Sequence, residues 1–178
     1  IDINGQSKGE FIVNTIDFTA GVNPLGPSHK AKHEIRKLVR GIHILPSDPV
    51  RSLRRYLCLR EGIGEDNIIF GNGSTHILDV LFQSLKPRTV LIPAPVSPRH
   101  NRVLREHGIE ERRVGLDPGD DYSLDVTGLL GAAQDCDAVV LANPHDVTGS
   151  VIPPDDLAVN MEETERRGTT LIIDEAYI

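Results

Sequence analysis

From residue 67 onward the chain alternates short apolar runs with amphipathic segments. The runs at 138–142 and 171–173 are continuously apolar, which is typical of strands covered on both faces of a sheet. Residues 74–85 instead place apolar side chains at helical spacing. The same patterns predict strands over 67–70, 89–92, 110–114, 138–142 and 169–173, and helices over 74–85, 98–107, 126–133 and 154–167. Strands that alternate with helices in this way predict an α/β fold with a mostly parallel sheet.

The first third of the chain is less regular. Residues 1–30 indicate an irregular arm, with 16–18 as a short extended piece and turn chemistry at 23–27, where proline and glycine cluster. Helices are predicted over 29–40 and 50–60, separated by a second proline break.

Composition narrows the class of protein. The 178 residues are 39% hydrophobic, enough to bury a core, and the net charge of −7 argues against a general nucleic-acid binder. No apolar run approaches the roughly 18 residues of a membrane span, and no signal-peptide pattern is seen. Cys58 and Cys136 lack metal-site spacing and form no disulfide framework, which favours a reducing cytoplasm. Because the sequence stops at Ile178, directly after a strand-like run, we expect an incomplete domain.

In parallel sheets, ligands bind beyond the carboxyl ends of the strands. The segments to examine are therefore 71–75, 93–100, 143–149 and 174–177. In the first of them a glycine turn leads into a helix that begins at Ser74 and Thr75. A helix amino terminus with hydroxyl groups binds anions, but the same pattern also describes a plain helix cap.

The acidic pair Asp174 and Glu175 ends a buried strand, where unpaired carboxylates are costly. Three interpretations remain open: a Mg²⁺ ligand pair, a partner for a protonated ring nitrogen, or a structural cap. The polar loop 143–149 is either a ligand-facing loop or an ordinary connection. Its His145 has no partner at metal-ligand spacing, and such a histidine is most often a surface residue.

Four segments, 16–27, 67–78, 142–149 and 171–178, together resemble the pyridoxal-phosphate enzymes of the aspartate-aminotransferase fold (fold type I) in their order and spacing. The chain is most similar to the branch of histidinol-phosphate aminotransferase and threonine-phosphate decarboxylase. The resemblance implies a three-layer αβα fold. Residues 1–48 would form the arm and part of a small domain, and residues 49–178 part of the cofactor-binding large domain.

The resemblance also assigns roles, with pyridoxal 5′-phosphate as the cofactor. Gly73, Ser74 and Thr75 would hold its phosphate, and Asp174 would keep its ring nitrogen protonated. Tyr177 would donate a hydrogen bond to the phenolic oxygen of the ring. The positions implied to lie near the substrate are Asn23 and Gly26.

Several positions depart from the family pattern. Asp146 stands where an asparagine would bind the phenolic oxygen, and a carboxylate there would repel that oxygen. Asn143 could serve instead, three positions away. Ser97 replaces the aromatic residue that stacks on the ring, which leaves His100 as the only nearby ring, and Leu45 replaces a tyrosine that reaches the neighbouring subunit's phosphate.

Covalent catalysis in this family needs a Schiff-base lysine after the aspartate, and no lysine follows Asp174. We therefore expect the amino-terminal part of a pyridoxal-phosphate enzyme that transaminates or decarboxylates a small amino-acid phosphate. It would be a cytoplasmic homodimer without nucleic-acid or membrane partners. The alternatives are a divergent, non-catalytic relative that keeps the fold, or a nucleotide- or magnesium-binding α/β module.

Overall fold

The computed structural model describes residues 23, 25–45 and 50–177. The extended piece expected at 16–18 lies outside these residues. The chain divides into two compact units, residues 1–51 and 52–178, which we describe separately. The predicted boundary between an arm with small-domain helices (1–48) and a large domain (49–178) stays a prediction.

The described part of the first unit is dominated by helix α1 (His29–Val39), which begins after Ser28, whose side chain accepts a hydrogen bond from the N–H of Ala31 at 3.2 Å. Its apolar stripe is uncovered, and Ile35, Leu38 and Val39 are all more than half exposed. Local pattern therefore predicted the helix correctly, whereas no described residue buries its stripe.

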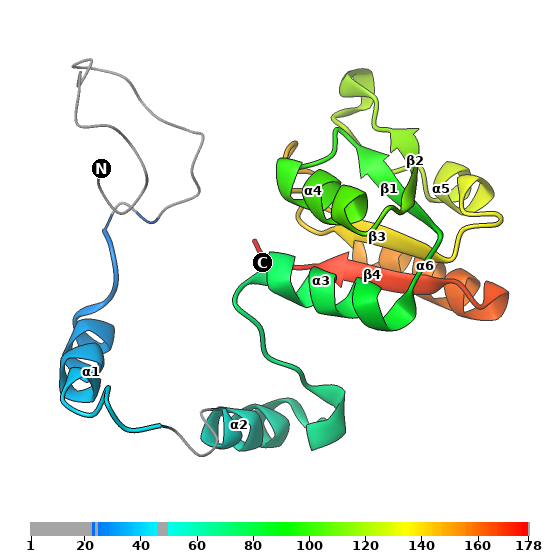
Figure 1. Ribbon diagram of the computed structural model, residues 1–178. Coiled ribbons are helices and arrows are strands. Elements are labelled where there is room, and N and C mark those ends of the chain that lie inside the picture. Colours follow the sequence, from blue (N-terminus) through cyan, green and yellow to red (C-terminus); the bar gives the residue numbers. More distant parts are fainter. Residues whose placement is uncertain (1–22, 24, 46–49, 178) are drawn as a thin grey trace. The chain divides into compact units, whose positions relative to one another are not determined.

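The second unit contains a sheet of four parallel strands in the order β2-β1-β3-β4 (Figure 1). The strands are β1 (Thr89–Ala94), β2 (Glu110–Gly115), β3 (Ala138–Ala142) and β4 (Thr170–Asp174). Helices α2 (Arg51–Glu61) and α3 (Ser74–Leu85) precede β1, and the strands are connected in turn by α4 (Pro98–Glu106), α5 (Val126–Ala132) and α6 (Pro154–Arg167). The predicted α/β fold with a parallel sheet is confirmed.

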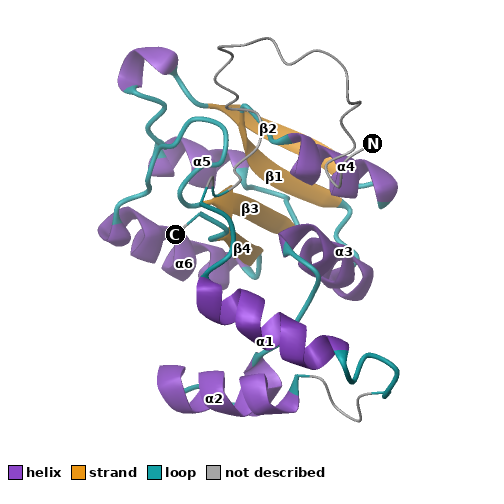
Figure 2. Cartoon of the chain, turned by 90° about the vertical axis from the view of Figure 1, so that its left-hand side faces the viewer, coloured by secondary structure: helices purple, strands orange, loops and turns teal. Residues whose placement is uncertain are grey.

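Successive strand residues point to opposite faces and enter two separate cores, because side chains alternate along a strand. Val90 and Val140 face one core, to which α3 and α4 contribute Leu78, Phe82, Val103 and Leu104. Leu91 and Val139 face the other, which includes Leu129 and Ala133 and is joined by Leu157 of α6. Figure 2 shows α3 and α4 on one side of the sheet and α5 and α6 on the other. This three-layer packing explains why the central strands are apolar on both faces.

One predicted element is wrong. Instead of a strand over 67–70, the chain forms a short 3₁₀-helix, η1 (Glu65–Asn67), followed by irregular backbone. Apolar residues there predicted a strand, but they find no neighbouring strand among the described residues, and Ile69 is 53% exposed. A second 3₁₀-helix, η2 (Pro118–Asp120), lies in the acidic, glycine-containing loop after β2.

Candidate cofactor-binding site

Asp174 is the last residue of β4, and its carboxylate is buried at the carboxyl edge of the sheet. Its Oδ2 accepts a hydrogen bond from Nε2 of His100 at 3.1 Å, and its Oδ1 accepts one from the N–H of Ala176 at 3.1 Å. The bond from His100 lowers the pKa of Asp174, although burial acts in the opposite direction. The strand end therefore presents a desolvated carboxylate that favours its charged form.

His100 is fixed in turn by Ser97, the residue that caps α4. Ser97 Oγ lies 3.0 Å from Nδ1 of His100, and both side chains are buried. With Nε2–H directed at the carboxylate, the Ser97 hydroxyl pairs with Nδ1 on the opposite side of the imidazole ring. The serine at the position of the expected stacking aromatic thus orients the histidine that holds Asp174.

Arg99, the neighbour of His100 on α4, reaches two of the residues that sequence analysis selected. Its Nη2 lies 3.2 Å from Oδ2 of Asp146 and 3.2 Å from the hydroxyl oxygen of Tyr177. The guanidinium group also lies over the Tyr177 ring, 5.5 Å from the ring centroid. Burial lowers the pKa of Arg99, but the hydrogen bond to Asp146 and the charges around it outweigh this effect, so the pKa is raised.

Helix α3 begins at Ser74, after Gly73, whose backbone lies at φ 83° and ψ 167°. This region is essentially open only to glycine. The helix starts at the edge of the sheet where β4 ends (Figure 1). The hydroxyl groups of Ser74 and Thr75 make no hydrogen bond within the described residues. Together with the free N–H groups of the first helical turn, they form a candidate anion site.

The loop after β3 differs from its sequence interpretation at one position. His145 is not a surface residue: it is 7% exposed, and its Nδ1 lies 2.9 Å from Oγ1 of Thr148. Burial lowers the pKa of His145, and the charge of Asp146 opposes that shift. Asn143 is buried, and its Oδ1 accepts the N–H of Ile152 at 3.0 Å, so its role as a substitute for the expected amide stays a prediction.

Asn23 and Gly26 belong to the first unit, where they form a turn. The N–H of Gly26 donates to the carbonyl oxygen of Asn23 at 2.9 Å, and the side-chain oxygen of Asn23 accepts the N–H of Leu25 at 2.9 Å. Leu45 is 92% exposed, and residues 46–49 after it lie outside the described part of the chain. The implied substrate contacts of Asn23 and Gly26 stay predictions.

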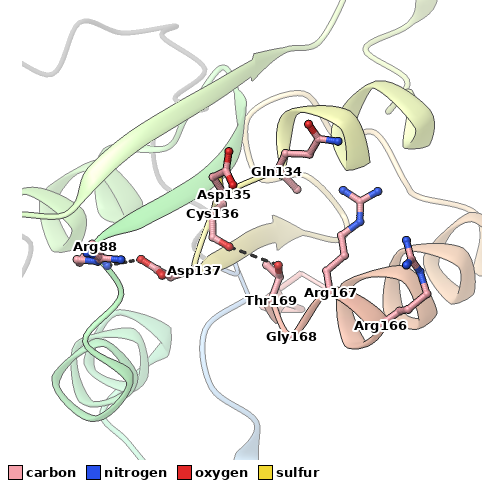
Figure 3. A pocket seen from close by; sticks show the side chains of 10 residues that line it. Arg88, Gln134, Asp135, Cys136, Asp137, Arg166, Arg167, Gly168 and Thr169 are labelled. Atoms are coloured by element: carbon pink, nitrogen blue, oxygen red, sulfur yellow. Dashed lines mark hydrogen bonds between the residues drawn. The ribbon is translucent and has the colours of Figure 1, made fainter.

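A hollow lies at the opposite edge of the sheet, before the strands begin (Figure 3). It measures about 720 Å³, but its polar groups serve local structure. Asp137 accepts the N–H groups of Arg88 and Thr89 at 2.7 and 3.0 Å, and Glu163 pairs with the two arginines that end α6. A cavity of only about 10 Å³ lies between Ser97, His100, His145 and Asp146. It is too small for a cofactor ring, so the candidate site is the open surface around it.

Glu175 is exposed, which separates it from the buried Asp174. Among the residues that the structure describes, no three histidine, cysteine, aspartate or glutamate side chains are grouped to hold a metal ion. The described helices include none that is long and apolar enough to cross a membrane.

The fold and the site define a class of protein: a doubly covered parallel sheet with a candidate anion site at a helix amino terminus and a buried carboxylate at its carboxyl edge. Residues 13–178 match the family model "Aminotransferase class I and II", and the chain belongs to that family. This confirms the resemblance drawn from the sequence.

Two relatives illustrate the branch. The chain is 28% identical over 163 residues to threonine-phosphate decarboxylase of Salmonella typhimurium, covering 92% of this chain and 45% of that protein. It is 29% identical over 177 residues to histidinol-phosphate aminotransferase of Bacillus subtilis, covering 96% and 48%. The chain thus spans about half the length of these relatives.

Solved structures agree on the fold. Histidinol-phosphate aminotransferase from Clostridium acetobutylicum superposes with a TM-score of 0.79 at 22% identity, over 90% of this chain and 47% of that one. The enzyme from Sinorhizobium meliloti in complex with pyridoxal-5′-phosphate gives a TM-score of 0.77 at 25% identity, over 86% and 42%.

No local pattern in the sequence assigns a role to Arg99 or His100, whose side chains hold the two acids of the site. Both lie in the strand-end segment 93–100 that the topology rule selected. The signal was their position, in the first turn of the helix that follows β1. The pattern does not indicate that Arg99 binds Asp146, 47 residues further along the chain, or that His100 binds Asp174, 74 residues further along.

Proposed function

We propose that this chain is the amino-terminal part of the cofactor-binding domain of a pyridoxal-phosphate enzyme. The enzyme would act on a small amino-acid phosphate, by transamination of histidinol phosphate or decarboxylation of threonine phosphate. The observation that carries the proposal is the buried Asp174 carboxylate at the end of β4, held by His100. A carboxylate whose pKa is lowered suits a protonated pyridine nitrogen.

The chemistry of the donor set supports this fit. A carboxylate has about four lone-pair positions, and the bonds from His100 and Ala176 leave Asp174 able to accept a further N–H. At the start of α3, Gly73, Ser74 and Thr75 would hold the phosphate through N–H and hydroxyl groups. When bound, a protonated pyridoxal ring supplies an electron sink for negative charge formed at the substrate Cα.

The reactive lysine is not among these 178 residues after Asp174, so additional chain would have to supply it. In our proposal the present residues bind and orient the ring, and Asp174 holds the proton at the ring nitrogen. Asn23 and Gly26 would contribute to the substrate site. The family relationship supports this division of roles, since the chain covers about half of its relatives.

A second candidate is a divergent relative that keeps the fold without catalysis, favoured by the replacements at Leu45, Ser97 and Asp146. Two of these positions nevertheless have specific polar partners. Ser97 lies against His100, and Asp146 pairs with Arg99. These contacts favour a site that still holds a ligand.

Titration of the 178-residue chain with pyridoxal 5′-phosphate, followed by the absorbance of the ring, tests the proposal. Asp174→Asn removes the charge at constant volume and should weaken binding about tenfold or more, the value of a charge-assisted hydrogen bond. Asp79→Asn is the matched control, because Asp79 also accepts a hydrogen bond from a histidine, His107, at 2.7 Å but lies on α3, in its second turn. Equal affinity of wild type and Asp174→Asn would refute the role of the aspartate, and no binding to wild type would refute the proposed cofactor.

The proposal includes a cytoplasmic homodimer, as expected from the sequence. Light scattering of the purified chain would measure its mass in solution. A strictly monomeric chain would remove the dimer from the proposal without affecting the cofactor site.

A further inference from the structure

Arg99 connects three separate parts of the fold with one guanidinium group. It is the second residue of α4, Asp146 lies in the loop after β3, and Tyr177 follows β4. Both hydrogen bonds, to the carboxylate and to the phenolic hydroxyl, come from the single nitrogen Nη2 at 3.2 Å. An arginine carries five N–H donors, so most of them remain uncommitted in these contacts.

The burial of Asp146 makes this contact consequential. The Asp146 side chain is 7% exposed, whereas that of Arg99 is 40% exposed. A buried carboxylate without a cation is strongly unfavourable, and an arginine at the rim compensates it while keeping its own contact with water. Other titratable groups that act on this pair are Tyr177, His145, whose burial favours its neutral form, and Asp174, which His100 holds.

Two consecutive residues of α4 therefore bind the two carboxylates of the site: Arg99 binds Asp146, and His100 binds Asp174. His100 holds the carboxylate suited to a cationic ring nitrogen, and Arg99 offers positive charge beside the position of a ring oxygen. An aromatic ligand with a protonated nitrogen and an anionic oxygen matches this order of charges. Asp146 alone would repel that oxygen, but Asp146 paired with Arg99 is neutral as a unit.

Resting on the proposed function, we infer that Arg99 is a positioning residue of the cofactor site. It clamps Asp146 against Tyr177 and supplies the positive charge that allows a carboxylate to stand beside the phenolic oxygen of the cofactor.

The test uses the full chain and pyridoxine 5′-phosphate, which has the ring, the phenolic oxygen and the phosphate but no aldehyde for surface lysines to trap. The variants are Arg99→Gln, Asp146→Asn, the double variant, and Arg102→Gln. Arg102 is the matched control, since it lies on the same helix but is 63% exposed and pairs with Glu106 at 3.7 Å.

Arg99→Gln should weaken binding about tenfold or more, because a buried carboxylate then faces the ligand alone. The double variant should return to within about threefold of wild type, since the neutral amide introduced by Asp146→Asn needs no cation. Arg102→Gln should bind as wild type does. In the Arg99→Gln complex, the pH midpoint of the phenolic ionisation, read from the ring absorbance, should rise, a shift that loss of packing alone would not produce.

Melting temperatures of the unliganded variants distinguish a failure of the inference about Arg99 from a failure of the cofactor proposal. Arg99→Gln should lower the melting temperature, and Asp146→Asn should restore it in the double variant. If wild type binds the ligand and Arg99→Gln matches Arg102→Gln in both affinity and midpoint, the inference about Arg99 is overturned while the cofactor proposal stands. If wild type binds no ligand although the melting temperatures show that Arg99→Gln and Asp146→Asn are coupled, the cofactor proposal fails, and Arg99 is only a structural residue.

Discussion

The pair of His100 and Asp174 allows a quantitative test of what burial contributes to the site. His100→Leu keeps a side chain of similar size but removes the donor that lies 3.1 Å from the carboxylate. The side chains of the pair are 5% and 9% exposed, so the lost bond is not replaced by water. Breaking a buried pair costs about 3–5 kcal/mol of unfolding free energy. Because Ala176 still donates to Asp174, we expect about 3 kcal/mol, near the lower end.

The comparison is His107→Leu, which removes a shorter bond of 2.7 Å to Asp79. That pair is more open, with side chains 19% and 39% exposed, and an exposed pair contributes little to stability because water competes for both groups. The variant also loses an edge-on contact with the ring of Phe82, but leucine keeps an apolar contact there. If distance controlled the energy, this variant would lose more than His100→Leu, whereas if burial controls it the order is reversed.

Urea unfolding followed by far-UV circular dichroism measures both losses from the midpoint and slope. The Asp174 pKa is lowered in the folded state from its ordinary 3.8, so its stabilising contribution is present above that value and is lost as the pH falls through the lowered pKa. The gap between wild type and His100→Leu should therefore narrow below about pH 4. Adding Asp174→Asn to His100→Leu should recover stability by removing the buried charge. A loss in His100→Leu no greater than that in His107→Leu would refute the argument.

Two further predictions concern backbone conformation and charge. Gly73→Ala should cost about 1–3 kcal/mol of unfolding free energy and weaken phosphate binding. The cost comes from backbone strain alone, since a Cβ at this position meets nothing within 4 Å. Gly115→Ala is the control, because its Cβ is equally uncrowded and its φ is not positive, and equal urea midpoints for the two variants would contradict the strain argument. Hydrogen bonds from Arg166 and Arg167 lower the pKa of Glu163 from 4.5 to about 2. Glu163→Gln should therefore lower the urea midpoint at neutral pH, and its difference from wild type should disappear as the pH falls from 4.5 to about 2. A difference in midpoint that does not depend on pH would contradict this origin.

The regular part of the fold was accessible from the sequence because its signals are local. Helices α3 and α6 begin and end where spacing, proline and glycine placed them, and β3 has the predicted bounds. The missed strand at 67–70 shows the limit of this reasoning. A strand needs a neighbour to pair with, and apolar composition cannot say whether that neighbour exists.

For the site, the rule about strand ends identified the correct segments, and family resemblance assigned roles to Asp174, Asp146 and Tyr177. Local sequence left Asp174 with three open interpretations and placed His145 at the surface. Neither question has a local answer, because burial depends on what packs above a residue from other parts of the chain.

The sequence by itself determined the alternation of elements, the parallel sheet and the segments that meet at its carboxyl edge, since periodicity and topology follow from short-range chemistry. Only the tertiary structure decided how the charges at that edge are balanced. His100 reaches Asp174 across 74 residues of chain, and Arg99 reaches Asp146 across 47. Electrostatic pairing depends on distance in space and on exclusion of water, and neither is encoded in the spacing of residues along the chain.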